Sequence, residues 1–196
     1  AFVAATAHVY ESMSESAMFV REVACLWGSQ PIGIVDAQTD DSGTTQTYSL
    51  TAATYIPALW GAYENGYVDI WDSTGATQRN ATGTLKVSGT SISNRTITMV
   101  GTETEMDNIT AGDYVYLRGF KGLSLKGLWD IFTNTGTLWT IPGTTYSLFL
   151  GNSKALGNGQ LVFENILHAL NKPAARGMKG DLVGYVSTSS WTDAMN

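Results

Sequence analysis

Residues 82–101 read TGTLKVSGTSISNRTITMVG, and apolar and polar side chains alternate at both ends of this stretch. A period of two residues is typical of a β-strand that buries one face and leaves the other in water. Similar runs begin at Tyr67 (YVDIWDS) and at Asp113 (DYVYLRG), and Gly, Asn and Asp residues between the runs supply turns. We therefore predict that residues 66–119 form a small antiparallel β-barrel or sandwich inserted in a larger chain.

The chain before this β-rich part begins with a helical pattern. Apolar residues recur at three- and four-residue steps over residues 1–26, which predicts an amphipathic helix that ends at Gly28. Short strands are predicted at 31–35 and 47–51, separated by a turn at 40–43, and Pro57 suits the first turn of a short helix. We assign residues 1–65 to an N-terminal helix followed by an extended arm.

Residues 120–160 are rich in aromatic side chains but show neither a helical nor a strand period. Turn signals lie at 133–136 and at Pro142-Gly143. We predict an extended segment whose aromatic rings pack on another surface, and periodicity leaves open whether this surface is the chain's own core or a neighbouring subunit. The candidate subunit contacts here are Lys121, Lys126, Trp129, Phe132, Trp139, Tyr146 and Phe149.

The last segment, residues 161–196, alternates predicted helix and strand. A helix is predicted over 161–170 and is ended by Asn171-Lys172-Pro173, after a flexible loop at 151–159. A buried strand is predicted at 182–186, and a further helix would begin at Trp191.

Composition and charge narrow the function classes. Apolar residues make up 43% of the chain and charged residues only 14%, against a usual value of about 25%. A surface this poor in charge is common in β-rich extracellular modules and in proteins covered by copies of themselves. The net charge is −6, which does not suit a nucleic-acid-binding surface, and no apolar run approaches the ~18 residues of a membrane span.

The charge is also unevenly distributed along the chain. Residues 1–117 hold four Lys/Arg against thirteen Asp/Glu, whereas residues 118–196 hold seven against four. An acidic part and a basic part could attract each other head to tail between copies. The simpler interpretation, that these charges only face solvent, stays open.

Catalytic signatures are missing from the sequence. Cys25 is the single cysteine, which excludes an internal disulfide, and its apolar neighbours predict a buried structural thiol. His8 and His168 lie on separate predicted helices, and no nucleophile elbow, zinc motif or calcium loop occurs. We therefore name no catalytic, cofactor-binding or metal-binding residue and expect the protein not to be an enzyme.

One acidic cluster lies between two predicted strands. Glu103, Glu105 and Asp107 could act as the paired carboxylates of a glycosidase. Because they alternate with Thr and Met at what we expect to be a hairpin tip, a solvated loop is the simpler prediction. Asn-x-Thr sequons begin at Asn80 and Asn94, and a third begins at Asn108.

Four stretches share their order and spacing with segments of one protein family. They are VREVACLWG with IGIV (20–35), GYVD through GDYVY (66–116), GLWD with NTGTL, YSL and GN (127–152), and FENILHAL with RG, GDLV and VS (163–187). In this order they resemble the major capsid proteins of tailed bacteriophages, in the branch whose Hong Kong 97-type fold carries a β-rich insertion. Thr188 stands where that family has proline.

The resemblance implies an α+β fold with an N-terminal helix, an inserted antiparallel barrel, an extended aromatic loop and a spine-like helix. Residues 161–196 would hold this spine helix and the start of the peripheral and axial domain. Because the family continues with a further α/β axial domain, we expect the chain to be a fragment that lacks the C-terminal part.

The implied function is structural. The chain would be the major capsid subunit, which assembles in the bacterial cytoplasm through hexamers and pentamers into the icosahedral shell of the virion. The shell would enclose DNA without sequence-specific binding, without a cofactor and without a membrane, and scaffold, portal or decoration proteins are further candidate partners. Some relatives form Lys–Asn cross-links; Lys121, Lys126 and Lys154 are available here, but no motif selects one, so we predict none.

Two alternatives come from other classes. Six Trp residues, Thr-rich strands and the sequons would suit a carbohydrate-binding or adhesin-like β-rich module, and the acidic cluster alone would suit a glycan hydrolase. The two predicted helices and the aromatic segment favour the capsid subunit, because a compact lectin sandwich would not need them.

Overall fold

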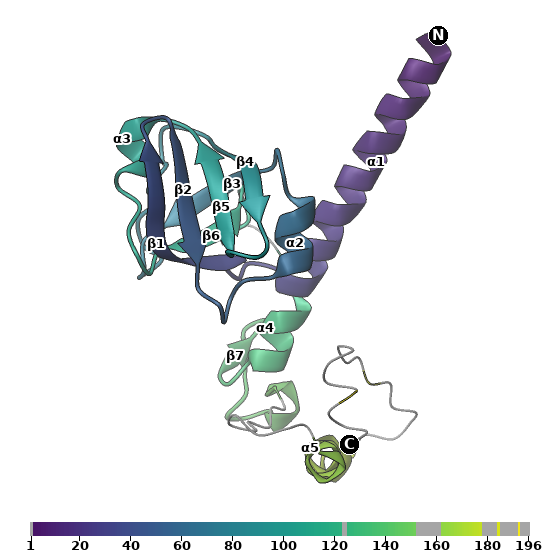
Figure 1. The fold of residues 1–196 in the computed structure, drawn as a ribbon. Helices are drawn as coiled ribbons and strands as arrows, with labels where there is room; N and C mark the ends of the chain where they lie inside the picture. The colour runs from purple at the N-terminus through teal and green to yellow at the C-terminus, as the bar shows by residue number, and fades with distance from the viewer. Residues whose placement is uncertain (1, 123–124, 152–161, 178–183, 185–191, 193–196) are drawn as a thin grey trace. The chain divides into compact units, whose positions relative to one another are not determined.

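The computed structural model describes residues 2–122, 125–151, 162–177, 184 and 192 of the 196-residue chain (Figure 1). The chain divides into two compact units, residues 1–130 and 131–196. Each unit is described by itself.

The first unit begins with the long helix α1 (Phe2–Trp27), which confirms the predicted N-terminal helix. The helix ends at Gly28, whose φ is +60° and whose N–H donates a hydrogen bond to the carbonyl oxygen of Ala24. A Cβ atom at Gly28 would collide with backbone atoms of Leu125 and Gly127. Glycine is therefore required here both by the left-handed backbone and by the close approach of a second segment.

A closed six-stranded β-barrel follows α1 (Figure 1), with the strand order β1-β2-β5-β4-β3-β6 and antiparallel pairing throughout. The short helices α2 and α3 interrupt the strands. The elements are β1 (Gly33–Ser42), β2 (Thr45–Leu50), α2 (Pro57–Ala62), β3 (Tyr67–Trp71), β4 (Leu85–Ser91), β5 (Thr96–Val100), α3 (Glu103–Met106) and β6 (Tyr114–Leu117).

The barrel is larger than the sequence predicted, because it begins at Gly33 and not at residue 66. The predicted short strands at 31–35 and 47–51 become the hairpin β1–β2, with its turn at Gly43-Thr44, and not part of an extended arm. This hairpin fills the gap between two other strands, since β2 pairs with β5 and β1 pairs with β6. Without it, β5 and β6 would each present an open edge.

The core lies inside the barrel and follows the predicted period of two. In β5, Ile97 and Met99 are fully buried, whereas Thr96 and Thr98 between them are only partly covered. Val23 of α1 and Trp60 of α2 join the same cluster, so both helices pack against the barrel. The buried apolar cluster consists of Val23, Ile32, Val35, Tyr48, Leu50, Leu59, Trp60, Val68, Ile70, Leu85, Val87, Ile97, Met99, Met106, Ile109, Val115 and Leu117.

The aromatic segment contains several short elements and is not one extended loop. They are α4 (Leu128–Thr133), which contains the border between the units, the hairpin β7 (Thr137–Leu138) and β8 (Ile141–Pro142), and the single 3₁₀ turn η1 (Ser147–Phe149). The hairpin turn consists of Trp139 and Thr140, whose φ angles are +49° and +67°. Two positive φ angles match the twist of a two-residue hairpin, although neither residue type signals such a turn.

The last described helix is α5 (Phe163–Ala175), which confirms a helix in this segment. Its predicted end at 171–173 is wrong, because the helix continues through Pro173 to Ala175. The predicted loop at 151–159, the strand at 182–186 and the helix from Trp191 fall almost entirely on residues outside the described part.

We expect Ile70→Ala to destabilise the barrel by about 2–5 kcal/mol, because it removes a fully buried side chain and leaves a cavity. Ile92→Ala is the matched control, since Ile92 is 54% exposed, and it should change the free energy of unfolding by less than about 0.5 kcal/mol. Urea unfolding of both variants measures the difference. Equal effects of the two variants would contradict the assignment of the core.

Candidate functional site

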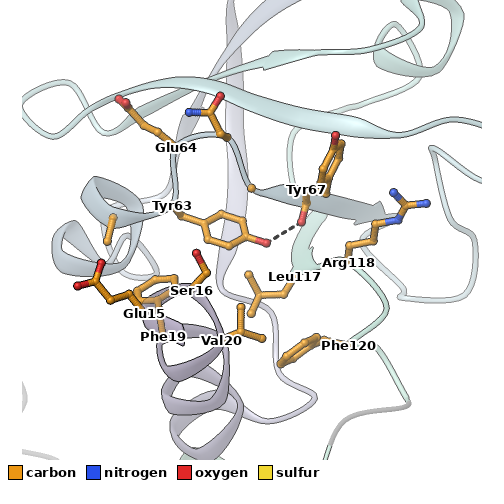
Figure 2. Close-up of a pocket in the computed structure, with 13 residues that line it drawn as sticks. Glu15, Ser16, Phe19, Val20, Tyr63, Glu64, Tyr67, Leu117, Arg118 and Phe120 are labelled. Carbon is orange, nitrogen blue, oxygen red and sulfur yellow. Dashed lines mark hydrogen bonds between the residues drawn. The ribbon is translucent and has the colours of Figure 1, made fainter. Parts of the chain in front are cut away.

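A groove of about 700 Å³ lies on the first unit, between α1, the segment after α2 and the end of β6 (Figure 2). Pockets of 300–1,000 Å³ are typical of ligand sites in proteins. Its lining consists of Glu15, Ser16, Phe19, Val20, Ala62, Tyr63, Glu64, Asn65, Gly66, Tyr67, Leu117, Arg118 and Phe120.

Tyr63 is at the centre of the groove. Its ring stacks on Phe19 with 6.0 Å between ring centroids, and it meets Trp60 edge-on at 6.3 Å. Its hydroxyl donates a hydrogen bond of 2.8 Å to the carbonyl oxygen of Tyr67, as Figure 2 shows. Gly66 permits this arrangement, because a Cβ atom there would collide with the Tyr63 ring.

The Tyr63 hydroxyl is a neutral hydrogen-bonding group. Burial raises the pKa of Tyr63 to about 12, the hydrogen bond to Tyr67 opposes this shift, and the charge of Asp69 adds to it. A phenol with this pKa stays protonated near neutral pH and does not act as a general base there.

The charged residues of the groove lie at its rim. Figure 2 shows Glu15 and Glu64 toward one end and Arg118 toward the other. The Arg118 guanidinium lies 5.5 Å from the centroid of the Tyr67 ring, a cation–π arrangement. Val20, Leu117 and Phe120 lie between these charges, so the groove combines an apolar floor with opposite charges at its two ends.

The structure leaves most of the predicted subunit contacts exposed. Trp129, Phe132, Trp139 and Tyr146 are among the exposed large apolar side chains, and Lys126 is exposed as well. Phe149 is half-buried, and its carbonyl oxygen accepts a hydrogen bond of 2.7 Å from the Asn134 amide.

Lys121 differs from the other predicted contacts, because it interacts with its own barrel. Its ammonium group lies 3.6 Å from the centroid of the Trp71 ring and donates a hydrogen bond to the carbonyl oxygen of Gly75. These two contacts hold the segment that follows β6 against the barrel.

The acidic cluster is only partly the solvated loop that we predicted, because Glu103 and Asp107 are exposed whereas Glu105 is buried. Residues Glu103–Met106 form α3, and Glu105 is buried, with one carboxylate oxygen accepting hydrogen bonds from the backbone N–H and the hydroxyl of Thr82. Asp107 accepts a hydrogen bond of 2.7 Å from the buried Gln46 amide. Glu105 and Asp107 therefore brace the end of the barrel, whereas Glu103 is exposed, so the alternation with Thr and Met was misleading for two of the three carboxylates.

The prediction of a buried thiol is also wrong, because Cys25 is exposed. Val23 faces the barrel core, and two residues further along an α-helix turn the side chain by about 200°, toward the opposite face. The apolar residues next to Cys25 in the sequence therefore did not predict whether its side chain is buried.

Asn80, the first residue of a predicted sequon, has a structural role. Its side chain is buried, accepts a hydrogen bond from the N–H of Ile70 and donates one to the carbonyl oxygen of Val68. These bonds hold the segment after β3 against the strand.

The described residues contain no group of three or more His, Cys, Asp or Glu that could hold a metal ion. Among these same residues, no helix is both long and apolar enough to cross a membrane. Comparisons of the chain with protein-family models, with curated proteins and with solved structures found no match.

The groove itself was not predicted from the sequence. Its aromatic residues come from α1 (Phe19), from the segment that runs from the end of α2 to the first residue of β3 (Tyr63 and Tyr67) and from just after β6 (Phe120), so they meet only once the barrel has closed. The one local signal is YENGY (residues 63–67), in which two tyrosines flank a turn where Asn65 has a φ of +68°.

We expect the pKa of Tyr63 to make unfolding depend on pH in alkaline solution. The unfolded phenol ionises near pH 10, whereas the folded one does so at about 12, so its contribution to stability is complete below pH 10 and is lost as the pH rises toward 12. The free energy of unfolding should therefore fall less between pH 9 and pH 11 in Tyr63→Phe than in the wild type. An equal fall in both proteins would contradict this assignment.

Proposed function

We propose that the chain is a structural subunit that assembles with copies of itself into a closed shell, as its resemblance to tailed-phage major capsid proteins implies. The observation that carries the proposal is the amount of large apolar side chain that both units expose. Such surface is costly in a monomer and typical of interfaces. In a shell, neighbouring copies would cover it.

Helix α1 exposes part of this surface. Its C-terminal end packs on the barrel through Val23 and the partly buried Phe19. Toward the N-terminus Val9, Tyr10 and Met13 are exposed, with Tyr10 at 70%. Figure 1 shows this end of α1 extending past the barrel. The stability of a helix in a protein depends mainly on the packing of its apolar face. A contact with a second chain would therefore stabilise the N-terminal end of α1.

The second unit exposes more of this surface than it buries. Its described residues include one buried large apolar side chain, Leu138, and α5 buries none of its residues. In contrast, Phe132, Trp139 and Tyr146 are exposed. Aromatic residues are enriched at protein interfaces, where they supply much of the binding energy.

The charge of the chain also supports a shell. Charged residues are depleted at the cores of interfaces, and only 14% of this chain is charged. A net charge of −6 would keep the subunits from binding the enclosed DNA tightly, because tight DNA binding requires clustered positive charge. Retention of DNA by the isolated protein at physiological salt would count against this part of the proposal.

Negative-stain electron microscopy and sedimentation of native material that contains this polypeptide test the proposal directly. Uniform icosahedral particles with this chain as the main component would support it. A monomer at every concentration would contradict it. Glycan binding by such a monomer would favour the carbohydrate-binding alternative, in which exposed Trp rings stack on sugars.

We expect Trp139→Ala to raise the concentration needed for assembly at least about tenfold, because a buried interface tryptophan contributes about 2 kcal/mol or more. Ile92→Ala is the matched control, since both side chains are 54% exposed and Ile92 lies in the turn between β4 and β5 of the first unit. It should leave the assembly concentration unchanged. Light scattering against protein concentration measures both variants, and equal behaviour would exclude Trp139 from the interface.

A further inference from the structure

The groove on the first unit has the shape and charge of a site for an amphipathic helix. Its floor is apolar, its acidic end holds Glu15 and Glu64, and its basic end holds Arg118 (Figure 2). In helix-in-groove recognition, an amphipathic helix inserts anchors at positions i, i+3, i+4 and i+7 into such a floor.

Helix α5 carries anchors at this spacing. They are Phe163, Ile166, Leu167 and Leu170, and none of the helix's residues is buried. Phe163 is 66% exposed and Leu167 46% exposed. One face of α5 therefore presents a continuous apolar row within the second unit.

The charges of α5 are arranged in the order that the groove requires. Glu164 lies in its first turn and Lys172 in its last. Eight residues of α-helix separate them, or about 12 Å along the axis. A helix lying along the groove with Glu164 at the Arg118 end would have Lys172 toward the end that holds Glu15 and Glu64.

We propose that the groove binds α5 of a second copy of the chain. This inference rests on the proposed self-assembly and names one contact within it. The charges of the units support it, because residues 1–130 hold seven Lys/Arg against fourteen Asp/Glu and residues 131–196 hold four against three.

Pairing of α1 with α1 is less favourable than pairing of the groove with α5. The polar side of α1 carries Glu11, Glu15 and Glu22, with Arg21 as its one Lys or Arg. Two such helices side by side would bring like charges together, which opposes binding. The basic end of α5 instead meets the acidic end of the groove.

Charge reversal with rescue tests the contact. Glu15→Lys combined with Glu64→Lys should raise the assembly concentration about three- to tenfold, and so should Lys172→Glu, because each puts like charges at one end of the groove. Combining all three changes should restore assembly toward the wild-type value. Glu11→Lys with Glu22→Lys is the matched control on α1 outside the groove, and it should leave the assembly concentration unchanged.

A disulfide trap gives a second readout that does not depend on charge. In a Cys25→Ser background, which removes the exposed native thiol, Ser16→Cys in the groove and Leu167→Cys on α5 should form a bond between two chains and give a dimer on non-reducing gels. Ser93→Cys on the exposed β4–β5 turn replaces Ser16→Cys in the control pair, which should give no dimer.

The outcomes separate this inference from the proposed function. If the wild type assembles, the charge-reversal variants assemble at the same concentration and no interchain disulfide forms, then the groove contact is wrong and self-assembly still stands. A disulfide formed only within single chains would overturn the contact as well. A wild-type protein that stays monomeric would overturn the proposed function itself.

Discussion

Closure of the barrel by the β1–β2 hairpin is the constraint on which the rest of the first unit depends. The closing contact between β1 and β6 is short, with Gly33 opposite Val115 and Ile34 opposite Tyr114, and backbone hydrogen bonds from Ile32 to Val115 and from Val35 to Asp113 extend it. Because α1 joins β1 through a short connection, this seam also fixes where the end of α1 lies. The groove exists only when α1, the loop after α2 and the end of β6 are held together in this way.

Buried polar side chains hold the irregular connections against the barrel. Asp113 is almost fully buried and accepts two hydrogen bonds from the Arg79 guanidinium and one from the N–H of Thr110. At the acidic end of the barrel, the buried Gln46 amide donates to Asp41 and to Asp107. Burial costs these groups less when each has a partner, and their fixed geometry ties the loops to particular strands. Several of the chain's few charged residues, among them Arg79 and Asp113, therefore hold loops in place.

The sequence predicted elements better than it predicted their partners. Local periodicity identified α1, α5 and the strands from Tyr67 to Leu117, because amphipathic patterns depend on nearby residues alone. The barrel boundary was missed because the pairing of β1 with β6 joins residues about 80 positions apart, and no local pattern records it. Cys25 and Glu105 were misplaced for a related reason, since burial depends on which segment packs against a side chain. The groove residues were not predicted at all. The predicted subunit contacts lie elsewhere in the chain, and four of their aromatic side chains are exposed.

The apolar side chains of the chain are divided between a buried core and exposed surfaces, and this division bears on the proposed self-assembly. The barrel encloses a core of fully buried side chains such as Ile70, Val87 and Met99, and this core lies within one chain. Most of the exposed large apolar residues lie instead on α1, on the aromatic segment and on α5, whereas the barrel and its turns expose Tyr67, Ile92 and Val100. A subunit with this division could fold first around its barrel and then bury the remaining surface by association, at no cost to the folded core. Tyr10, Trp139 and Phe163 lie exposed on three separate elements, so the self-assembly that we propose would cover them through contacts on several sides.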